Sequence, residues 1–151
     1  STTTLTKKKS KKRSASNSAA PPDPITLFVD RCAWSRLLGE ALDKIGANYI
    51  AHHQRFAPDA PDEEWLAVAG SEAWVVLTRD KHIRRRPTEL EAFREHNVIV
   101  FVLAAGNASA AETADLVARL YDKIQRLAVQ AKPPVMYSVT RSGISKPIKF
   151  K

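Results

Sequence analysis

Two stretches of the sequence decide the fold class: Phe28-Val29-Asp30-Arg31 and Val75-Val76-Leu77-Thr78-Arg79-Asp80. Each runs an apolar segment into an aspartate, and a short apolar run bounded by polar residues predicts a buried β-strand. Each carboxylate is then expected where its strand ends, and in an open α/β sheet ligands bind at that edge. A third acidic cluster, Asp62-Glu63-Glu64, lies between the two stretches. Like charges repel unless a cation or a proton separates them, so the sequence predicts a crevice for a hard divalent metal ion.

Strands and helices are predicted to alternate from residue 25 to residue 140. The expected strands are 25–29, 48–51, 73–77, 98–103 and 135–140. The expected helices are 35–45, ended by Gly46; a short one with Asp62 as N-cap, ended by Gly70; one opened by a capping box at Thr88–Glu91; and one opened by a capping box at Ser109 and Glu112 and stopped by Pro133-Pro134. Near-continuous apolar strands alternating with helices predict an α/β fold with a mostly parallel central sheet covered on both faces.

Length and charge divide the chain into one domain and two basic tails. The 151 residues suit a single core, and 24 basic against 16 acidic side chains give a net charge of +8. Residues 1–24 carry +5 and residues 141–151 carry +4, so residues 25–140 are close to neutral. We expect a disordered tail over 1–24, a domain over 25–142 and a flexible tail over 143–151. The run from Lys7 to Arg13 is open to three interpretations: a non-specific nucleic-acid contact, a localisation signal or a solubilising tail.

Composition also limits the cellular compartments and the kinds of chemistry that the sequence leads us to expect. Cys32 is the only cysteine, which excludes an internal disulfide. No apolar run is long enough for a membrane span, and the basic N-terminal segment does not resemble a signal peptide, so a cytoplasmic protein without membrane contact is expected. Cys32 is expected to be a small buried side chain rather than a nucleophile, and His52 and His53 are expected to be structural.

The three predicted acidic segments each have a simpler interpretation. Asp62 is a good helix cap, Asp80 can begin a turn, and Asp30 can pair with a surface arginine. Their joint placement favours a shared role. Magnesium and manganese prefer carboxylate and water oxygens and need few protein ligands. Such an ion lowers the pKa of a bound water and stabilises charge on a phosphoryl oxygen.

A cationic segment follows Asp80 directly. It contains Lys81, His82, Arg84, Arg85 and Arg86. Arginine forks suit phosphate oxygens, so we assign substrate binding to Arg31, Lys81, Arg84, Arg85 and Arg86. The competing interpretation is a solvated loop balanced by Glu89, Glu91 and Glu95.

The segments 27–31, 61–66 and 74–87, in this order, resemble the compact PIN-like domains related to VapC-type toxins of bacterial toxin–antitoxin systems. The resemblance covers about residues 25–142. It implies a three-layer Rossmann-like sandwich and Mg²⁺- or Mn²⁺-dependent endonucleolytic cleavage of RNA, which a cognate antitoxin protein restrains. Such toxins often form homodimers, so a homodimer is also expected, although the sequence does not identify its interface.

By the resemblance, Asp30, Asp62 and Asp80 match the catalytic acids, and Asp30, Asp62, Glu63 and Asp80 match the metal ligands. His82 stands where many PIN-like sequences have a further aspartate, and Gly106-Asn107 offers no carboxylate. An alternative is therefore a PIN-like module that has lost catalysis and binds nucleic acid or protein. A receiver-type phosphoacceptor domain is disfavoured, because it needs paired acids after the first strand and Asp30 is followed by Arg31.

Overall fold

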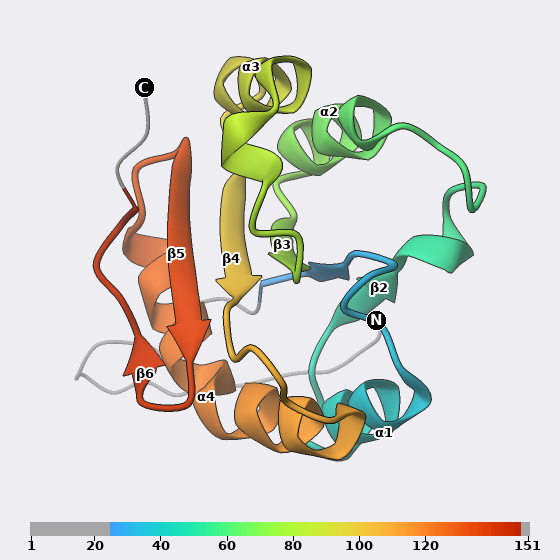
Figure 1. Cartoon of the computed structure of the whole chain (residues 1–151), viewed down its shortest axis with the longest axis vertical. Helices are drawn as coiled ribbons and strands as arrows, with labels where there is room; N and C mark the ends of the chain where they lie inside the picture. Colours follow the sequence, from blue (N-terminus) through green and yellow to red (C-terminus); the bar gives the residue numbers. More distant parts are fainter. Residues whose placement is uncertain (1–24, 149–151) are drawn as a thin grey trace, which may run out of the picture.

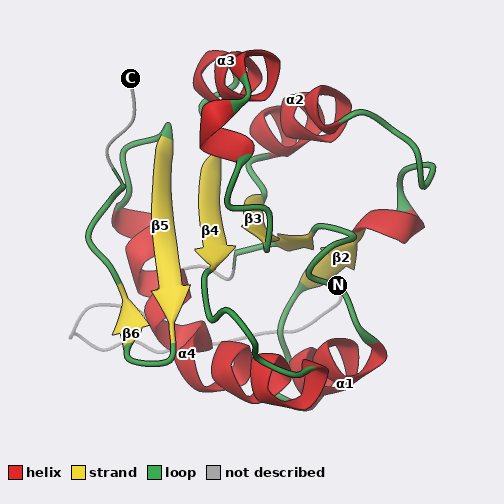
Figure 2. Ribbon diagram, in the orientation of Figure 1, coloured by secondary structure: helices red, strands yellow, loops and turns green. Residues whose placement is uncertain are grey.

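A computed structural model describes residues 25–148 as alternating strands and helices, so the predicted N-terminal tail over 1–24 lies outside the described residues. The elements are β1 (Leu27–Val29), α1 (Arg36–Lys44), β2 (Tyr49–Ala51), the single 3₁₀ turn η2 (His52–Gln54), α2 (Asp62–Glu72), β3 (Val75–Thr78), the turn η3 (Ile83–Arg85), α3 (Pro87–Glu95), β4 (Ile99–Leu103), α4 (Ala110–Gln130), β5 (Val135–Thr140) and β6 (Gly143–Ile144). Figure 2 shows the strands as one sheet with helices around it.

The sheet has six strands in the order β2-β1-β3-β4-β5-β6. The first five are parallel, and only β6 runs antiparallel, against β5. β1 lies at the centre of the first three strands, with Leu27 beside Tyr49 on one side and Val75 on the other. The predicted mostly parallel α/β sheet is therefore confirmed, and the molecule is a Rossmann-like sandwich.

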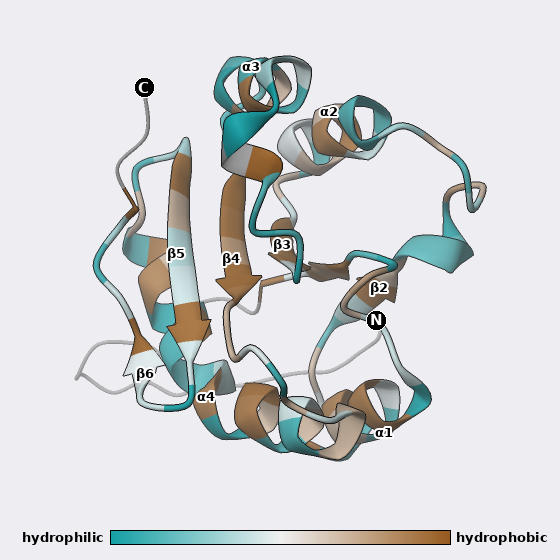
Figure 3. Ribbon diagram, viewed as in Figure 1, coloured by the Kyte–Doolittle hydropathy of each residue, from teal (hydrophilic) through white to brown (hydrophobic). Residues whose placement is uncertain are grey.

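Helices cover both faces of the sheet. α1 packs against α4 on one face and α2 packs against α3 on the other (Figure 1). Each face has its own apolar core: Leu38, Leu42 and Val117 are buried in the first, and Phe28, Trp65 and Phe93 in the second. Apolar residues run along β4 in Figure 3, whereas hydrophilic ones predominate on the segment between β3 and α3. Every residue of β1 and β3 is buried, as expected for central parallel strands that are covered on both faces.

Two of the helix ends that the sequence predicted are confirmed. The Ser109 side chain accepts a hydrogen bond from the Glu112 N–H while Glu112 reaches back to the Ser109 N–H, which confirms that capping box. Gly46 follows α1 with φ +73°, a conformation that glycine adopts without strain. The capping box predicted at Thr88–Glu91 is wrong, because α3 begins earlier, with Pro87 in its first turn and Arg86 as N-cap. Proline is favoured there, since its missing N–H needs no partner.

The ends of α2 also differ from the prediction. Asp62 is the first helical residue and Pro61 is the N-cap, without a side-chain cap. Gly70 does not end the helix, which continues to Glu72 and ends at Ala73 in a left-handed conformation. A Cβ on Gly70 would lie 2.1 Å from the carbonyl oxygen of His96, so glycine is required at this point by close packing of the chain after α3.

The strand at the end of the sheet beside β5 was not predicted from the sequence. Strand β6 pairs with β5, and the Ile148 N–H donates to the Met136 carbonyl at 2.7 Å. Residues 143–148, expected to form a flexible tail, are thus paired to the sheet edge. Among residues 25–148, no helix combines the length and the apolar composition that crossing a bilayer requires.

Candidate metal centre

The candidate site lies at the carboxyl ends of β1 and β3. These strands are neighbours, yet the chain leaves β1 towards α1 on one face and β3 towards α3 on the other. Such a switch in direction opens a crevice beyond the strand ends, where α/β proteins bind ligands. Asp30 follows β1 directly and Asp80 lies two residues beyond β3, so both predicted acids are at this edge.

Asp30 is buried, with 3% of its surface exposed, and its oxygens are used inside the protein. Its Oδ1 accepts the Arg31 N–H at 2.7 Å, and its Oδ2 accepts the Thr78 hydroxyl at 2.8 Å. The same hydroxyl oxygen of Thr78 accepts the Asp80 N–H at 3.1 Å. Thr78 therefore links the two strand-end acids through one buried hydroxyl group.

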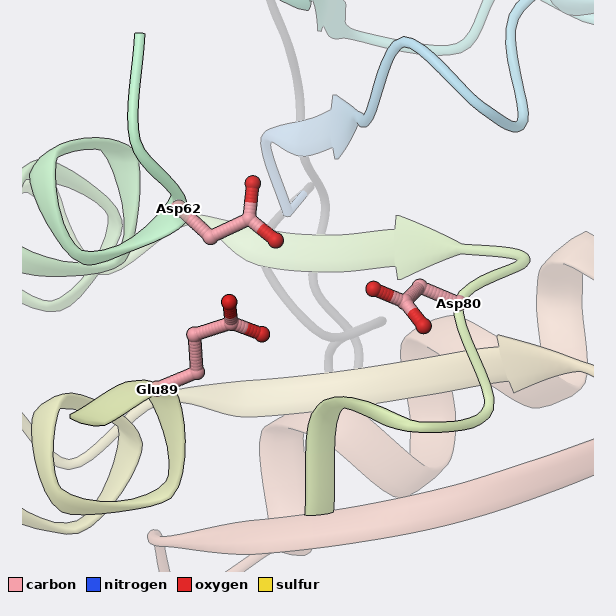
Figure 4. Close-up of side chains that lie close together, drawn as sticks. All are labelled: Asp62, Asp80 and Glu89. Carbon is pink, nitrogen blue, oxygen red and sulfur yellow. The ribbon is translucent and has the colours of Figure 1, made fainter. Parts of the chain in front are cut away.

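Three carboxylates converge in front of this edge. Asp62, Asp80 and Glu89 each offer an oxygen within 4.8 Å of the others, and all three side chains are partly buried. Figure 4 shows them pointing towards one another from the start of α2, from the segment after β3 and from the first turn of α3. Three carboxylates this close together could hold one hard divalent cation, which usually takes only a few protein ligands and keeps several waters.

The electrostatic environment of the group favours a cation. Desolvation raises the pKa of Asp62 above its ordinary value, and the charges of Asp30 and Asp80 raise it further, against the lowering effects of Trp65 and Arg31. Desolvation likewise raises the pKa of Glu89, with Asp62 and Asp80 adding to it against the contact from Arg86. The charges of Asp62 and Glu89 are thus disfavoured by burial and by acidic neighbours, and a divalent ion would relieve this.

Two arginines supply positive charge at the group. Arg86 Nη1 donates to Asp80 Oδ2 at 2.5 Å and to Glu89 Oε1 at 3.0 Å. Arg31 Nη2 donates to Asp62 Oδ1 at 3.3 Å. Both were predicted to bind substrate, and in this structure both guanidinium groups contact acids of the site.

His52 holds Arg31 in this position. It is buried, it packs against Phe28 and Phe56, and its Nε2 lies 2.9 Å from Arg31 Nη1. Because a guanidinium can only donate, Nε2 accepts the hydrogen bond and the ring is neutral. Burial and the charge of Arg31 lower the pKa of His52 accordingly. The structural role expected for this histidine is confirmed.

The remaining predicted residues lie around the group. Glu63 is partly buried on α2 but is not one of the three converging acids. Lys81 and Arg85 are exposed on the segment between β3 and α3, and the side chain of Arg84 lies outside the described part of the chain. His82 is exposed and donates its N–H to Asp80 Oδ1 at 3.0 Å.

Cys32 differs from its prediction. The residue is exposed, and its thiol contacts Asp30 Oδ2 and Thr78 Oγ1, each at 3.3 Å, instead of filling an apolar gap. Desolvation of the thiol and the charge of Asp30 raise its pKa, which argues against a reactive thiolate.

Sequence reasoning missed Glu89, which was taken as a charge balancing a basic loop. A signal was present: a helix that follows a parallel strand starts at the carboxyl edge of the sheet, so an acid in its first turn lies there. Glu89 has this position in α3, as Asp62 does in α2. The donor set of three carboxylates matches a hard divalent cation such as Mg²⁺ or Mn²⁺, which prefers oxygen ligands.

Comparison with known proteins identifies the family of the chain. No curated protein and no solved structure matches the chain. A family model described as a PIN-like domain matches residues 25–105, which is more than half of the 151 residues and includes β1, β3 and all three converging acids. The chain therefore belongs to the PIN-like domain family, whose members are generally nucleases.

Proposed function

We propose that this protein is a metal-dependent endoribonuclease that hydrolyses RNA phosphodiesters. The observation that carries the proposal is the convergence of Asp62, Asp80 and Glu89 within 4.8 Å of one another beside the carboxyl ends of β1 and β3. PIN domains typically depend on a divalent metal, and Mg²⁺ or Mn²⁺ suits these ligands. When bound, such an ion lowers the pKa of a water and stabilises charge on a phosphoryl oxygen.

The chain's own residues have separate tasks in this scheme. Asp62, Asp80 and Glu89 hold the ion, and Asp30 fixes the Asp80 backbone through the Thr78 hydroxyl. The predicted catalytic role of Asp30 thus becomes one of positioning. Lys81 and Arg85 are exposed next to the acids, where phosphate oxygens of an RNA strand would need positive charge.

We further propose that the ribonuclease is the toxin of a toxin–antitoxin pair, in line with the resemblance to VapC-type toxins. A cognate antitoxin protein and a homodimer are its expected protein partners. A small neighbouring reading frame encoding a DNA-binding protein that co-purifies with this chain and blocks RNA cleavage would support this role. A neighbour without such an effect would favour a housekeeping ribonuclease.

Substitution of the converging acids tests the activity. Asp80→Asn and Glu89→Gln should each reduce Mn²⁺-dependent RNA cleavage by about 100-fold or more, since each removes a charged ligand. Glu64→Gln is the matched control, because Glu64 is exposed and lies outside the group on α2. EDTA should abolish cleavage by the wild type. Cleavage that persists in EDTA, or in both acid variants with unchanged circular dichroism, would refute the proposal.

A comparison of two glutamates tests the ligand set itself. Glu89→Gln should weaken Mn²⁺ binding more than Glu63→Gln, because only Glu89 offers an oxygen within 4.8 Å of both aspartates. Isothermal titration calorimetry without RNA measures both variants. A larger loss in Glu63→Gln would restore the ligand set that the sequence alone suggested.

The alternative is a binding module without catalysis. The observation favouring it is that the Arg86 guanidinium pairs with two of the three carboxylates, while His82 stands where a further acid is common. Calorimetry decides between the two: no heat with Mn²⁺, together with RNA binding that survives EDTA, would favour the module.

A further inference from the structure

We propose that Arg86 is a built-in counter-ion of the metal centre, which a divalent cation must displace in order to bind. The inference rests on the proposed metal-dependent function and adds a positioning residue to it. Its basis is that the guanidinium contacts two of the three carboxylates that would hold the ion.

Distances make joint occupancy unfavourable. Arg86 Nη1 lies 2.5 Å from Asp80 Oδ2 and 3.0 Å from Glu89 Oε1, so it occupies the space between two of the three converging acids. A divalent ion held by Asp80 and Glu89 would compete with Nη1 for these carboxylates, and the positive charges of the ion and the guanidinium would repel one another at short range.

Charge balance leads to the same conclusion. The three converging acids carry three negative charges, Asp30 beside them adds a fourth, and Arg31 on Asp62 neutralises one. A divalent ion neutralises two more, so much less negative charge is left for Arg86 to balance. Without the ion, Arg86 is the cation that keeps Asp80 and Glu89 side by side despite their repulsion.

The local structure allows Arg86 to leave. It is the N-cap residue of α3, three residues before Glu89 and six after Asp80, and its side chain remains 45% exposed. The acids are less exposed, at 18% for Asp80 and 14% for Glu89. The guanidinium can therefore turn into solvent while the carboxylates stay in place.

Calorimetry with Mn²⁺ and no RNA tests the displacement. Arg86→Gln should bind Mn²⁺ at least about fivefold more tightly than the wild type, the lower end of typical coupling between two sites. Arg86→Lys, which keeps the charge but not the planar fork, should fall between the two. Arg85→Gln is the matched control, because it removes the same charge from the same segment, and its Mn²⁺ affinity should change less than about twofold.

Unfolding in EDTA gives a readout that needs no metal. Arg86→Gln should unfold at lower urea concentration than the wild type, because Asp80 and Glu89 lose their counter-ion. Added Mn²⁺ should stabilise the variant more than it stabilises the wild type.

The outcomes separate this inference from the proposed function. Equal or weaker Mn²⁺ binding by Arg86→Gln, with the wild type binding and cleaving normally, would overturn the counter-ion role and leave the nuclease intact. Binding only by the variant would support the counter-ion role in its strongest form. Absence of Mn²⁺ binding by all four proteins would refute the metal centre, and the inference with it.

Discussion

Replacing Thr78 by valine should loosen the link between the two strand-end acids. Thr78 is fully buried, and its hydroxyl donates to Asp30 Oδ2 at 2.8 Å while accepting the Asp80 N–H at 3.1 Å. Valine has nearly the same shape without the hydroxyl, so Thr78→Val removes a hydrogen bond to a buried charge and leaves a backbone N–H without that partner. A hydrogen bond to a charged group contributes about 1.5–3 kcal/mol, so we expect the free energy of unfolding to fall by about 3 kcal/mol.

Thr78→Ser is the control, since it keeps the hydroxyl and removes one methyl group at about 1 kcal/mol. Urea unfolding followed by tryptophan fluorescence measures both variants, because Trp65 and Trp74 are buried in the core. Mn²⁺ affinity should fall in the valine variant and stay near the wild-type value in the serine variant, because only valine frees the Asp80 backbone. Equal stabilities of the two variants would refute the role assigned to the hydroxyl.

Three further predictions follow from packing and from the shifted pKa values. Gly70→Ala should lower the free energy of unfolding by about 3 kcal/mol, because the added Cβ would lie 2.1 Å from a carbonyl oxygen. Gly106→Ala is the control: no atom lies within 4 Å of a Cβ there, so it should change the free energy of unfolding by less than about 0.5 kcal/mol. Urea unfolding of both variants gives the comparison. Desolvation raises the pKa of Asp62 and Glu89, and a protonated carboxyl does not bind metal, so Mn²⁺ affinity should fall between neutral pH and about pH 5; an affinity that stays constant over that range in calorimetry would contradict this. Desolvation of the Cys32 thiol and the charge of Asp30 raise the thiol pKa, so at neutral pH it should react with iodoacetamide more slowly than in the urea-unfolded chain; equal rates by mass spectrometry would count against this.

The predictions of secondary structure that succeeded rest on signals between residues close in sequence. The strand after Ala73 and the helix opened by Ser109 depend on neighbouring residues, through apolar runs and a capping box, and both lie close to where they were expected. Thr88 failed as a cap because Pro87 starts the helix earlier. Strand β6 was missed because two residues carry no periodic signal, and its pairing with β5 depends on the turn at Arg141 and Ser142.

The sequence by itself determined a parallel α/β sheet and the position of Asp30 and Asp80 at its carboxyl edge, because strand identity and strand ends are properties of short continuous segments. The tertiary structure decided which acids meet. Glu89 joins Asp62 and Asp80 only because α2 and α3 pack side by side on one face, and Arg86, at the start of α3, pairs with Asp80 and Glu89 because this packing brings the two acids together. Contacts between side chains on different elements depend on that packing, which no local pattern of residues encodes.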